Sequence, residues 1–191
     1  MRSLLFAALV PFFAAATPAL AGEITGRVTS PKGGGGAVVY VVHADGKFAP
    51  PTKPAEMDQR KMSFVPYILP ILVGTTVEFK NDDQVNHNVF TPDGEGYNLG
   101  TWGPGQSKAH LFDKAGVYTQ LCSLHPEMEA YIVVAQNPYF AVAKEDGTFT
   151  IAGVPDGTYQ LRAVGKGIKK KERSKDFPVT VAGKTETTLA Y

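Results

Sequence analysis

The loop from Cys122 to Met128 constrains this chain more than any other stretch. Cys122 is the only cysteine among the 191 residues, and His125 and Met128 follow it at intervals of three. Apolar runs rich in Val, Ile and Tyr lie on both sides, so these side chains are predicted to sit on a short loop between two strands. With a second imidazole, this thiolate, imidazole and thioether would form the His₂Cys plane and weak axial Met of a blue-copper electron-transfer site.

The second imidazole is predicted to be that of His87, which ends a polar loop (residues 81–86) after an alternating strand segment. Asn88 follows it directly. Its N–H is predicted to reach the Cys122 sulfur, while its side chain contacts the region of Ser123. The expected ligands of one mononuclear copper ion, cycling between Cu(I) and Cu(II), are therefore His87, Cys122, His125 and Met128.

Two further predictions concern residues outside this ligand set, namely Gln120 and the two remaining histidines. Strand alternation places Gln120 on the same inward face as Tyr118 and Cys122. Its amide must then be hydrogen-bonded, or the strand must bulge at that point. The remaining histidines are predicted to be ordinary solvated residues, namely His43 and His110.

The first 21 residues have the pattern of a secretory signal peptide. Arg2 supplies the positive start, residues 4–16 the apolar core, and residues 19–21 a small-x-small cleavage site. The chain is therefore expected to be exported, to the periplasm in a bacterium, with no membrane span after the signal is removed. A single cysteine cannot form an internal disulfide in an oxidising compartment, and metal ligation would protect Cys122 there.

Charge on the mature chain is balanced, and nothing in it suggests a nucleic-acid partner. Without the signal peptide the chain has 18 basic and 18 acidic residues, because only Arg2 is lost from the total. Residues 166–175 nevertheless carry six basic side chains, offset by Glu172. They are expected to form a solvated hairpin loop, and the alternative is a docking patch for an acidic partner.

Short apolar runs separated by glycine and proline turns predict an all-β fold. Strands are expected near residues 24–28, 37–42, 71–80, 107–112, 116–122 and 131–134, and in several short runs between residues 140 and 190. The remaining central segments are interpreted as a connection (43–56), an edge or irregular stretch broken by prolines (57–70), and a long glycine-rich loop (91–106).

Three motifs between residues 57 and 134 resemble those of the cupredoxins, especially of the short-loop kind. They are Gly-Thr-Thr-Val77, His87-Asn88-Val-Phe90, and Gly116-x-Tyr-x-x-x-Cys122-x-x-His125-Pro-x-Met128 with Ile132-x-Val134 after it. The resemblance implies a Greek-key sandwich with copper at one end. It also implies three equatorial ligands, His87, Cys122 and His125, and an axial Met128. The family usually has an apolar residue where Gln120 stands.

The two flanks are similar to another family, the carboxypeptidase-regulatory-like (transthyretin-like) sandwiches. The motifs are Ile24-x-Gly-x-Val with Gly36-Ala-Val-Val-Tyr-Val, and Glu145-Asp-Gly-Thr-Phe-Thr-Ile with Val154-Pro-Asp-Gly-Thr-Tyr. We therefore expect a cupredoxin domain (53–136) inserted into a second small β-sandwich made by residues 22–52 and 137–191. In the alternative arrangement, residues 37–42 form the first cupredoxin strand and residues 137–191 are an appendage.

The arrangement as a whole resembles bacterial exported proteins of the methylamine-utilisation or plastocyanin-like kind. That likeness implies an electron carrier rather than an enzyme, with a redox protein such as a cytochrome or a dehydrogenase as its partner. Copper delivery and a non-redox binding role remain alternatives. Four histidines in total cannot furnish a trinuclear cluster beside a blue site, which disfavours a multicopper oxidase. Nucleophilic catalysis by Cys122 and His125 would leave Met128 without a role.

Overall fold

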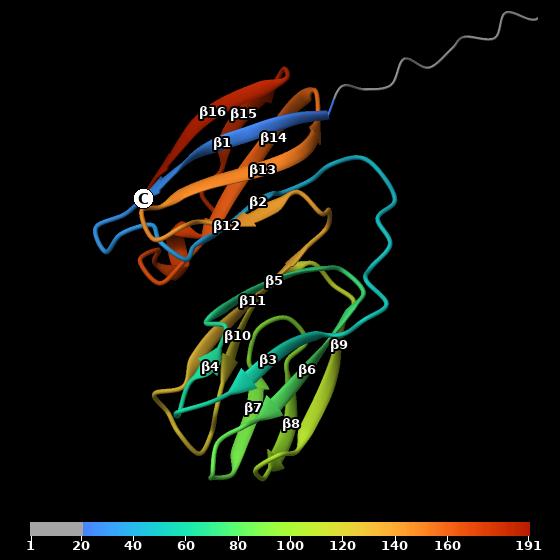
Figure 1. Cartoon of the computed structure of the whole chain (residues 1–191), viewed down its shortest axis with the longest axis vertical. Coiled ribbons are helices and arrows are strands. Elements are labelled where there is room, and N and C mark those ends of the chain that lie inside the picture. The colour runs from blue at the N-terminus through green and yellow to red at the C-terminus, as the bar shows by residue number, and fades with distance from the viewer. Residues whose placement is uncertain (1–20) are drawn as a thin grey trace, which may run out of the picture.

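The computed structural model of the chain describes residues 21–191, which form two β-sandwich lobes (Figure 1). The predicted all-β fold of two β-sandwiches is confirmed. Apart from Ala21, the predicted signal peptide lies outside the described residues. Within residues 21–191, no helix has the length and apolar character needed to cross a membrane.

The inner lobe is the continuous stretch from residue 55 to residue 135, and it packs two sheets together. One sheet has the order β5-β11-β10-β7-β8 and the other has the order β4-β3-β6-β9. The strands are β3 (Ala55–Gln59), β4 (Phe64–Val65), β5 (Ile68–Leu72), β6 (Thr75–Asn81), β7 (His87–Thr91), β8 (Tyr97–Trp102), β9 (Ser107–Phe112), β10 (Gly116–Leu121) and β11 (Glu129–Ala135). In β6 every second residue is buried, which gives this sheet its apolar inner face.

Two predictions for the inner lobe were wrong, because tertiary pairing overrides local composition. The long loop predicted for residues 91–106 contains β8, which pairs antiparallel with β7 at the edge of its sheet. Its Gly100 has a φ of 72° and lies opposite a register shift in β7, so an edge strand tolerates this glycine. The segment predicted as a connection runs into β3, which has no β-branched residue but pairs parallel with β6. The edge stretch predicted for residues 57–70 is confirmed by β4 and β5, which lie at the edges of their sheets.

The outer lobe combines the two ends of the described chain. Its sheets have the orders β13-β1-β16 and β12-β2-β14-β15. Its strands are β1 (Ala21–Thr29), β2 (Val38–Val41), β12 (Phe140–Val142), β13 (Thr148–Pro155), β14 (Gly157–Val164), β15 (Phe177–Val181) and β16 (Lys184–Ala190). Since β2 pairs with β12 and β14, the inner lobe lies in sequence between two neighbouring strands of the outer lobe.

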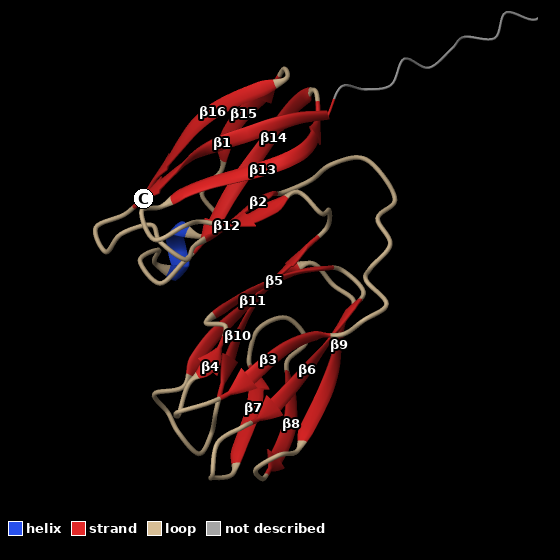
Figure 2. Cartoon of the chain, in the orientation of Figure 1, coloured by secondary structure: helices blue, strands red, loops and turns tan. Residues whose placement is uncertain are grey.

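A small apolar cluster joins the two lobes where they meet. Val38 and Val164 of the outer lobe are fully buried against Ile68, Tyr131 and Val133 of the inner lobe. One loop between β14 and β15 carries a single 3₁₀ turn at Lys170–Glu172, the only helical piece that the described residues contain (Figure 2). Both lobes therefore have their own cores. The chain crosses between them twice, once between β2 and β3 and once between β11 and β12.

The core of the inner lobe generates a stability prediction. Phe79 on β6 is fully buried, so Phe79→Ala should cost about 3 to 5 kcal/mol through lost apolar contact and the cavity left behind. Leu111 on the neighbouring β9 is 52% exposed, so Leu111→Ala should change stability by less than about 0.5 kcal/mol. Urea denaturation of the metal-free protein measures both. Equal losses in the two variants would contradict this placement of the core.

Candidate metal centre

Turns at one end of the inner lobe bring the predicted ligands together. His87 opens β7, and Cys122 follows β10 directly. His125 and Met128 lie on the loop that leads from β10 into β11. This end of the inner lobe points away from the outer lobe, as the lower loops in Figure 1 show. Antiparallel pairing of β10 with β11 keeps the ligand loop short, and β10 also pairs with β7.

The donor atoms of His87, Cys122 and His125 converge on one point. The Nδ1 atoms of the two histidines lie 3.0 Å apart. The Cys122 Sγ lies 4.0 Å from His87 Nδ1 and 3.6 Å from His125 Nδ1. Nitrogen and sulfur ligands stand about 2.0 to 2.3 Å from a bound metal ion, so three in one plane are roughly 3.5 to 4 Å apart. The two sulfur–nitrogen separations fall in this range and the nitrogen–nitrogen separation is shorter. One thiolate with two imidazoles fits copper.

The pocket is dry on all sides except at His125. His87 is fully buried, Cys122 is 3% exposed and Met128 is 1% exposed, whereas His125 is only half-buried. Cys122 and Met128 belong to the same apolar cluster, which also includes Val89. A turn hydrogen bond of 3.0 Å, from the Met128 N–H to the His125 carbonyl, holds the loop in shape. Such burial excludes water from the sulfur while leaving one imidazole edge accessible.

Asn88 ties the two ligand-bearing segments together, and the contacts predicted for it are confirmed. Its backbone N–H donates to the Cys122 Sγ across 3.4 Å. Its side-chain oxygen accepts from the Ser123 N–H at 3.2 Å and from the Ser123 hydroxyl at 2.9 Å. Its amide nitrogen donates to the Gly100 carbonyl at 2.9 Å. One buried side chain therefore fixes the start of β7 relative to the cysteine loop.

Asp83 orients the His87 imidazole from the side opposite the pocket. The Asp83 Oδ2 lies 2.9 Å from His87 Nε2. A carboxylate only accepts hydrogen bonds, so Nε2 carries the ring proton and the lone pair of Nδ1 faces the pocket. Metal-binding histidines generally donate their second ring N–H in this way, which fixes both tautomer and orientation.

Asp83 is itself held in place by the turn between β3 and β4. The N–H groups of Lys61 and Met62 donate to its two oxygens at 2.6 and 2.8 Å. Both residues adopt left-handed φ values, 53° and 58°, which non-glycine residues rarely do. Two backbone hydrogen bonds between Arg60 and Ser63 close this two-residue turn. The carboxylate thereby stabilises a strained turn, and the turn fixes the carboxylate.

Hydrogen bonding also keeps Asp83 ionised. Burial acts to raise the pKa of its carboxyl group. The N–H groups of Met62 and Lys61 and the imidazole of His87 outweigh that effect and hold the pKa below its ordinary value. The charged carboxylate therefore persists at neutral pH as an acceptor for His87. The sequence analysis missed Asp83. The only sequence feature that could have indicated its role is that a carboxylate stands four residues before the candidate ligand His87, in a loop of unpredicted conformation.

Gln120 satisfies its buried amide by hydrogen bonding rather than by a bulge. It is fully buried, and its Oε1 accepts from the Tyr97 hydroxyl. Its Nε2 donates to the Tyr118 carbonyl at 3.3 Å, and the β10–β11 register runs without interruption through this position. Burial raises the pKa of Tyr97, so its hydroxyl remains a donor. The hydrogen bonding predicted for Gln120 is therefore confirmed, and the predicted alternative of a bulge is not observed.

The other two histidines lie outside the pocket. His43 is exposed on the outer lobe, 3.4 Å from Asp45, as predicted. His110 on β9 is half-buried and stacks on Tyr97 with ring centroids 3.9 Å apart, which corrects the prediction that it is a solvated residue. Burial lowers the pKa of His110. Its partner Tyr97 lies on β8, the strand that the sequence analysis had interpreted as a loop.

A two-sheet Greek-key sandwich with a His-Cys-His pocket at one end defines the cupredoxin class of copper proteins. Residues 52–135 match the family described as copper binding proteins, plastocyanin/azurin family. The inner lobe is therefore a cupredoxin domain of the plastocyanin/azurin family, and its cofactor is a single copper ion.

Three similar proteins illustrate the extent of the likeness. Amicyanin-alpha from Methylorubrum extorquens is 27% identical over 138 residues, which are 70% of this chain and 99% of that protein. A purple cupredoxin from Nitrosopumilus maritimus is 31% identical, with 42% of this chain and 99% of that chain aligned at a TM-score of 0.40. A copper-containing nitrite reductase from Thermus scotoductus SA-01 is 32% identical at a TM-score of 0.43, with 50% of this chain aligned. This chain spans only 25% of that reductase.

The Asp83 contact generates a prediction about copper affinity. In Asp83→Asn, one carboxylate oxygen becomes an NH₂ group, which accepts no hydrogen bond, so the side chain can no longer accept from Lys61, Met62 and His87 together. The orientation of His87 should loosen, and Cu(II) affinity should fall by about 10- to 100-fold. Competition titration of the purified protein against a chelator of known affinity measures this change.

The neighbouring Asp82 supplies a matched control. It is exposed and pairs with Arg60 at 3.0 Å, without a contact to the ligands. Asp82→Asn makes the same chemical change one residue away and should leave Cu(II) affinity within about threefold of the wild-type value, because exposed ion pairs contribute little. If both variants bind Cu(II) equally, Asp83 does not orient the site.

Proposed function

We propose that this protein is a periplasmic type 1 copper protein that carries single electrons between redox partners. Four residues would hold the copper ion: His87, Cys122, His125 and Met128. The observation that carries the proposal is the convergence of two imidazole nitrogens and one thiolate sulfur within 4.8 Å in a buried pocket. Bound copper would supply the exchange between the Cu(I) and Cu(II) states.

The chain itself would keep the ligand geometry unchanged between the two oxidation states. Three of the proposed ligands lie on one short loop, and Asn88 fixes that loop to β7 through three hydrogen bonds to Cys122 and Ser123. Asp83 fixes the imidazole of His87 on the other side. The backbone N–H of Asn88 contacts the Cys122 sulfur. Asn88 is therefore proposed to adjust the electron density of the sulfur and the reduction potential of the site. A site this constrained needs little rearrangement to move an electron.

Electrons are proposed to pass through the exposed edge of His125. Three exposed apolar residues form what we call the apolar rim: Leu124 and Pro126, which flank His125 in the sequence, and Val85, two residues before His87. Val85 is 43% and Leu124 is 48% exposed, and Pro126 is also exposed. Large exposed apolar side chains that gather around a functional group are typical of a protein contact surface. A cytochrome or a dehydrogenase is the proposed kind of partner, and amicyanin-alpha is the relative that supports this choice.

Location and domain organisation complete the proposal. The signal-peptide pattern of residues 1–21 supports export to the periplasm. Pairing of β2 with β12 and β14 supports the division into residues 22–52 and 137–191 around an inserted domain at 53–136. The second sandwich is proposed to be of the carboxypeptidase-regulatory-like kind. The protein is proposed to be an electron carrier rather than an enzyme.

The rate of electron self-exchange tests this function, because it requires two copies to meet at their exposed imidazole edges. NMR line broadening in mixtures of the reduced and oxidised protein measures it. Leu124→Glu places a charge on the apolar rim and should slow self-exchange by at least about tenfold through like-charge repulsion. Leu111→Glu, on the exposed face of β9, adds the same charge elsewhere and should have a much smaller effect.

The same samples separate electron transfer from copper delivery. If copper passes to an apo-acceptor protein faster than electrons exchange between copies, the delivery function replaces the one proposed. If Leu124→Glu and Leu111→Glu slow self-exchange equally, electrons do not leave through the apolar rim.

A further inference from the structure

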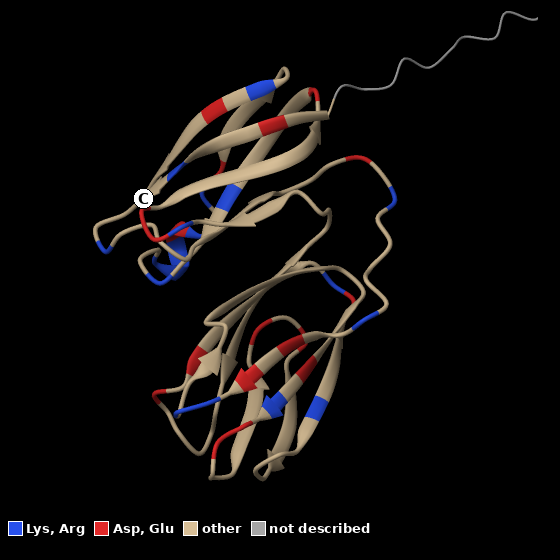
Figure 3. Ribbon diagram, viewed as in Figure 1, with Lys and Arg blue, Asp and Glu red and all other residues tan. Residues whose placement is uncertain are grey.

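Positive charge in this chain is concentrated in one short piece of the outer lobe. Residues 166–175, which we call the basic segment, hold six basic residues and one acidic residue, a net charge of +5. The rest of the described chain holds twelve basic and seventeen acidic residues, a net charge of −5. Figure 3 shows the blue cluster beside the junction between the lobes, with acidic residues spread over the inner lobe. The molecule is therefore strongly dipolar although it is neutral as a whole.

Contacts with the rest of the protein hold the basic segment in one conformation. Lys170 pairs with Asp93 of the inner lobe at 3.2 Å, and the Arg173 guanidinium lies 4.1 Å from the centre of the Tyr131 ring. Lys175 donates to the Ala190 carbonyl at 2.7 Å. The segment is thus a fixed surface rather than a free loop, and a partner would lose little conformational entropy by binding it.

A second group of lysines faces solvent and has no partner among the described residues. Lys32, Lys169 and Lys171 are exposed, and no ion pair within residues 21–191 includes any of them. Contacts that fix the segment therefore use only part of its charge. Like charges gathered on one surface repel each other, so folding gains nothing from these three side chains. Binding of an anion would remove that repulsion.

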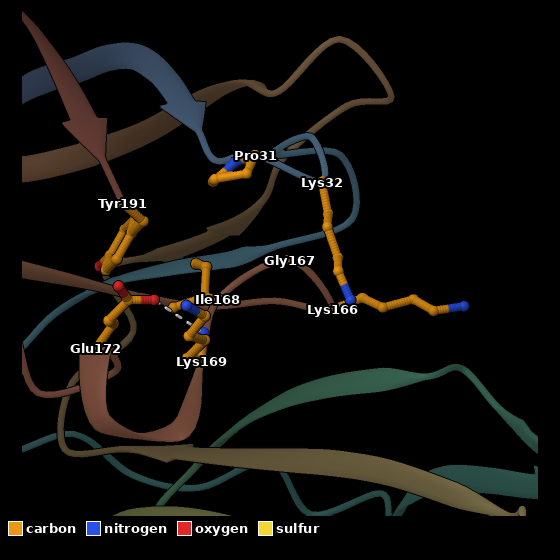
Figure 4. Close-up of a pocket in the computed structure, with 8 residues that line it drawn as sticks. All are labelled: Pro31, Lys32, Lys166, Gly167, Ile168, Lys169, Glu172 and Tyr191. Atoms are coloured by element: carbon orange, nitrogen blue, oxygen red, sulfur yellow. Dashed lines mark hydrogen bonds between the residues drawn. The ribbon is translucent and has the colours of Figure 1, made fainter.

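Two of these lysines, Lys32 and Lys169, border a hollow of about 200 Å³ in the outer lobe, together with Lys166. Figure 4 shows Lys32 and Lys166 on one side and Lys169 and Glu172 on the other. The floor is apolar and is formed by three residues: Pro31, Ile168 and Tyr191. The one acidic side chain, Glu172, is engaged with the Lys169 N–H at 3.2 Å. An apolar floor with a cationic rim suits a side chain that has methylene groups and a terminal carboxylate.

We infer that the basic segment, together with Lys32, is a docking surface for an acidic face of a partner protein. Protein is favoured over an anionic membrane because stable binding to lipid needs apolar side chains that insert beside the charges. The large exposed apolar residues of the described chain all lie elsewhere, at Val65, Val85, Leu111, Leu124 and Val142.

This surface is distinct from the apolar rim and leaves it free. The copper ligands lie at the end of the inner lobe that points away from the outer lobe (Figure 1). The outer lobe would then anchor the protein to one partner while the exposed edge of His125 meets another. Such tethering raises the effective concentration of the copper domain near its anchoring partner.

Fluorescence anisotropy with labelled poly-L-glutamate tests this inference at low and at high salt. Wild-type protein should bind, and binding should weaken steeply as salt is added. The double variant Lys169→Glu/Lys171→Glu should bind at least about tenfold more weakly, because two attractive charges become repulsive. The control Lys47→Glu/Lys144→Glu changes the net charge equally at exposed positions of the same lobe and should bind within about threefold of wild type.

Three outcomes would overturn the inference. Equal weakening in both double variants would mean that only net charge matters. Binding to phosphatidylglycerol vesicles without binding to poly-L-glutamate would mean that the surface meets lipid. Absence of any binding at low salt would mean that the lysines are merely solvated. Because Cys122→Ser should bind poly-L-glutamate as the wild type does, the result is independent of the proposed electron-transfer function.

Discussion

The convergence of two imidazoles and one thiolate at one end of the inner lobe is the constraint on which the rest of this structure depends. The imidazole of His87 and the thiolate of Cys122 are buried, and a buried polar group must have a partner or its desolvation destabilises the fold. Each of these two groups has a partner supplied from a different part of the chain. Asn88 donates to the Cys122 sulfur and holds Ser123, while Asp83 accepts from His87. Even the turn between β3 and β4 adopts a strained left-handed backbone to serve that carboxylate.

The outer lobe stands in a different relation to the metal pocket. It meets the inner lobe through a small apolar cluster and through Arg173 and Lys170, and it leaves the ligand end uncovered. It has a core of its own, while Val38 and Val164 are buried against the inner lobe. A division of labour follows from this arrangement: the inner lobe holds the copper, and the outer lobe presents a fixed basic surface.

The sequence was sufficient to predict what depends on short-range chemistry. Cys122, His125 and Met128 share one loop, and His87-Asn88 is a local pair, so the pocket and the Asn88 contacts could be predicted. What it could not reveal depends on partners distant in the chain. The residues of β3 are poor strand formers, and the strand exists because β6 pairs with it. The glycines of β8 favoured the prediction of a loop, but an edge strand tolerates them. Asp83 gains its role only when the β3–β4 turn reaches it.

The central claim is that one copper ion is bound by the Cys122 thiolate together with two imidazoles. The visible absorption spectrum of the mature protein loaded with Cu(II) tests it most directly, since thiolate ligation of Cu(II) is what gives the copper proteins of this class their colour. The account predicts an intense blue or green colour that disappears on addition of a reductant, and that is missing in Cys122→Ser although this variant still folds. A colourless Cu(II)-loaded wild-type protein would contradict it.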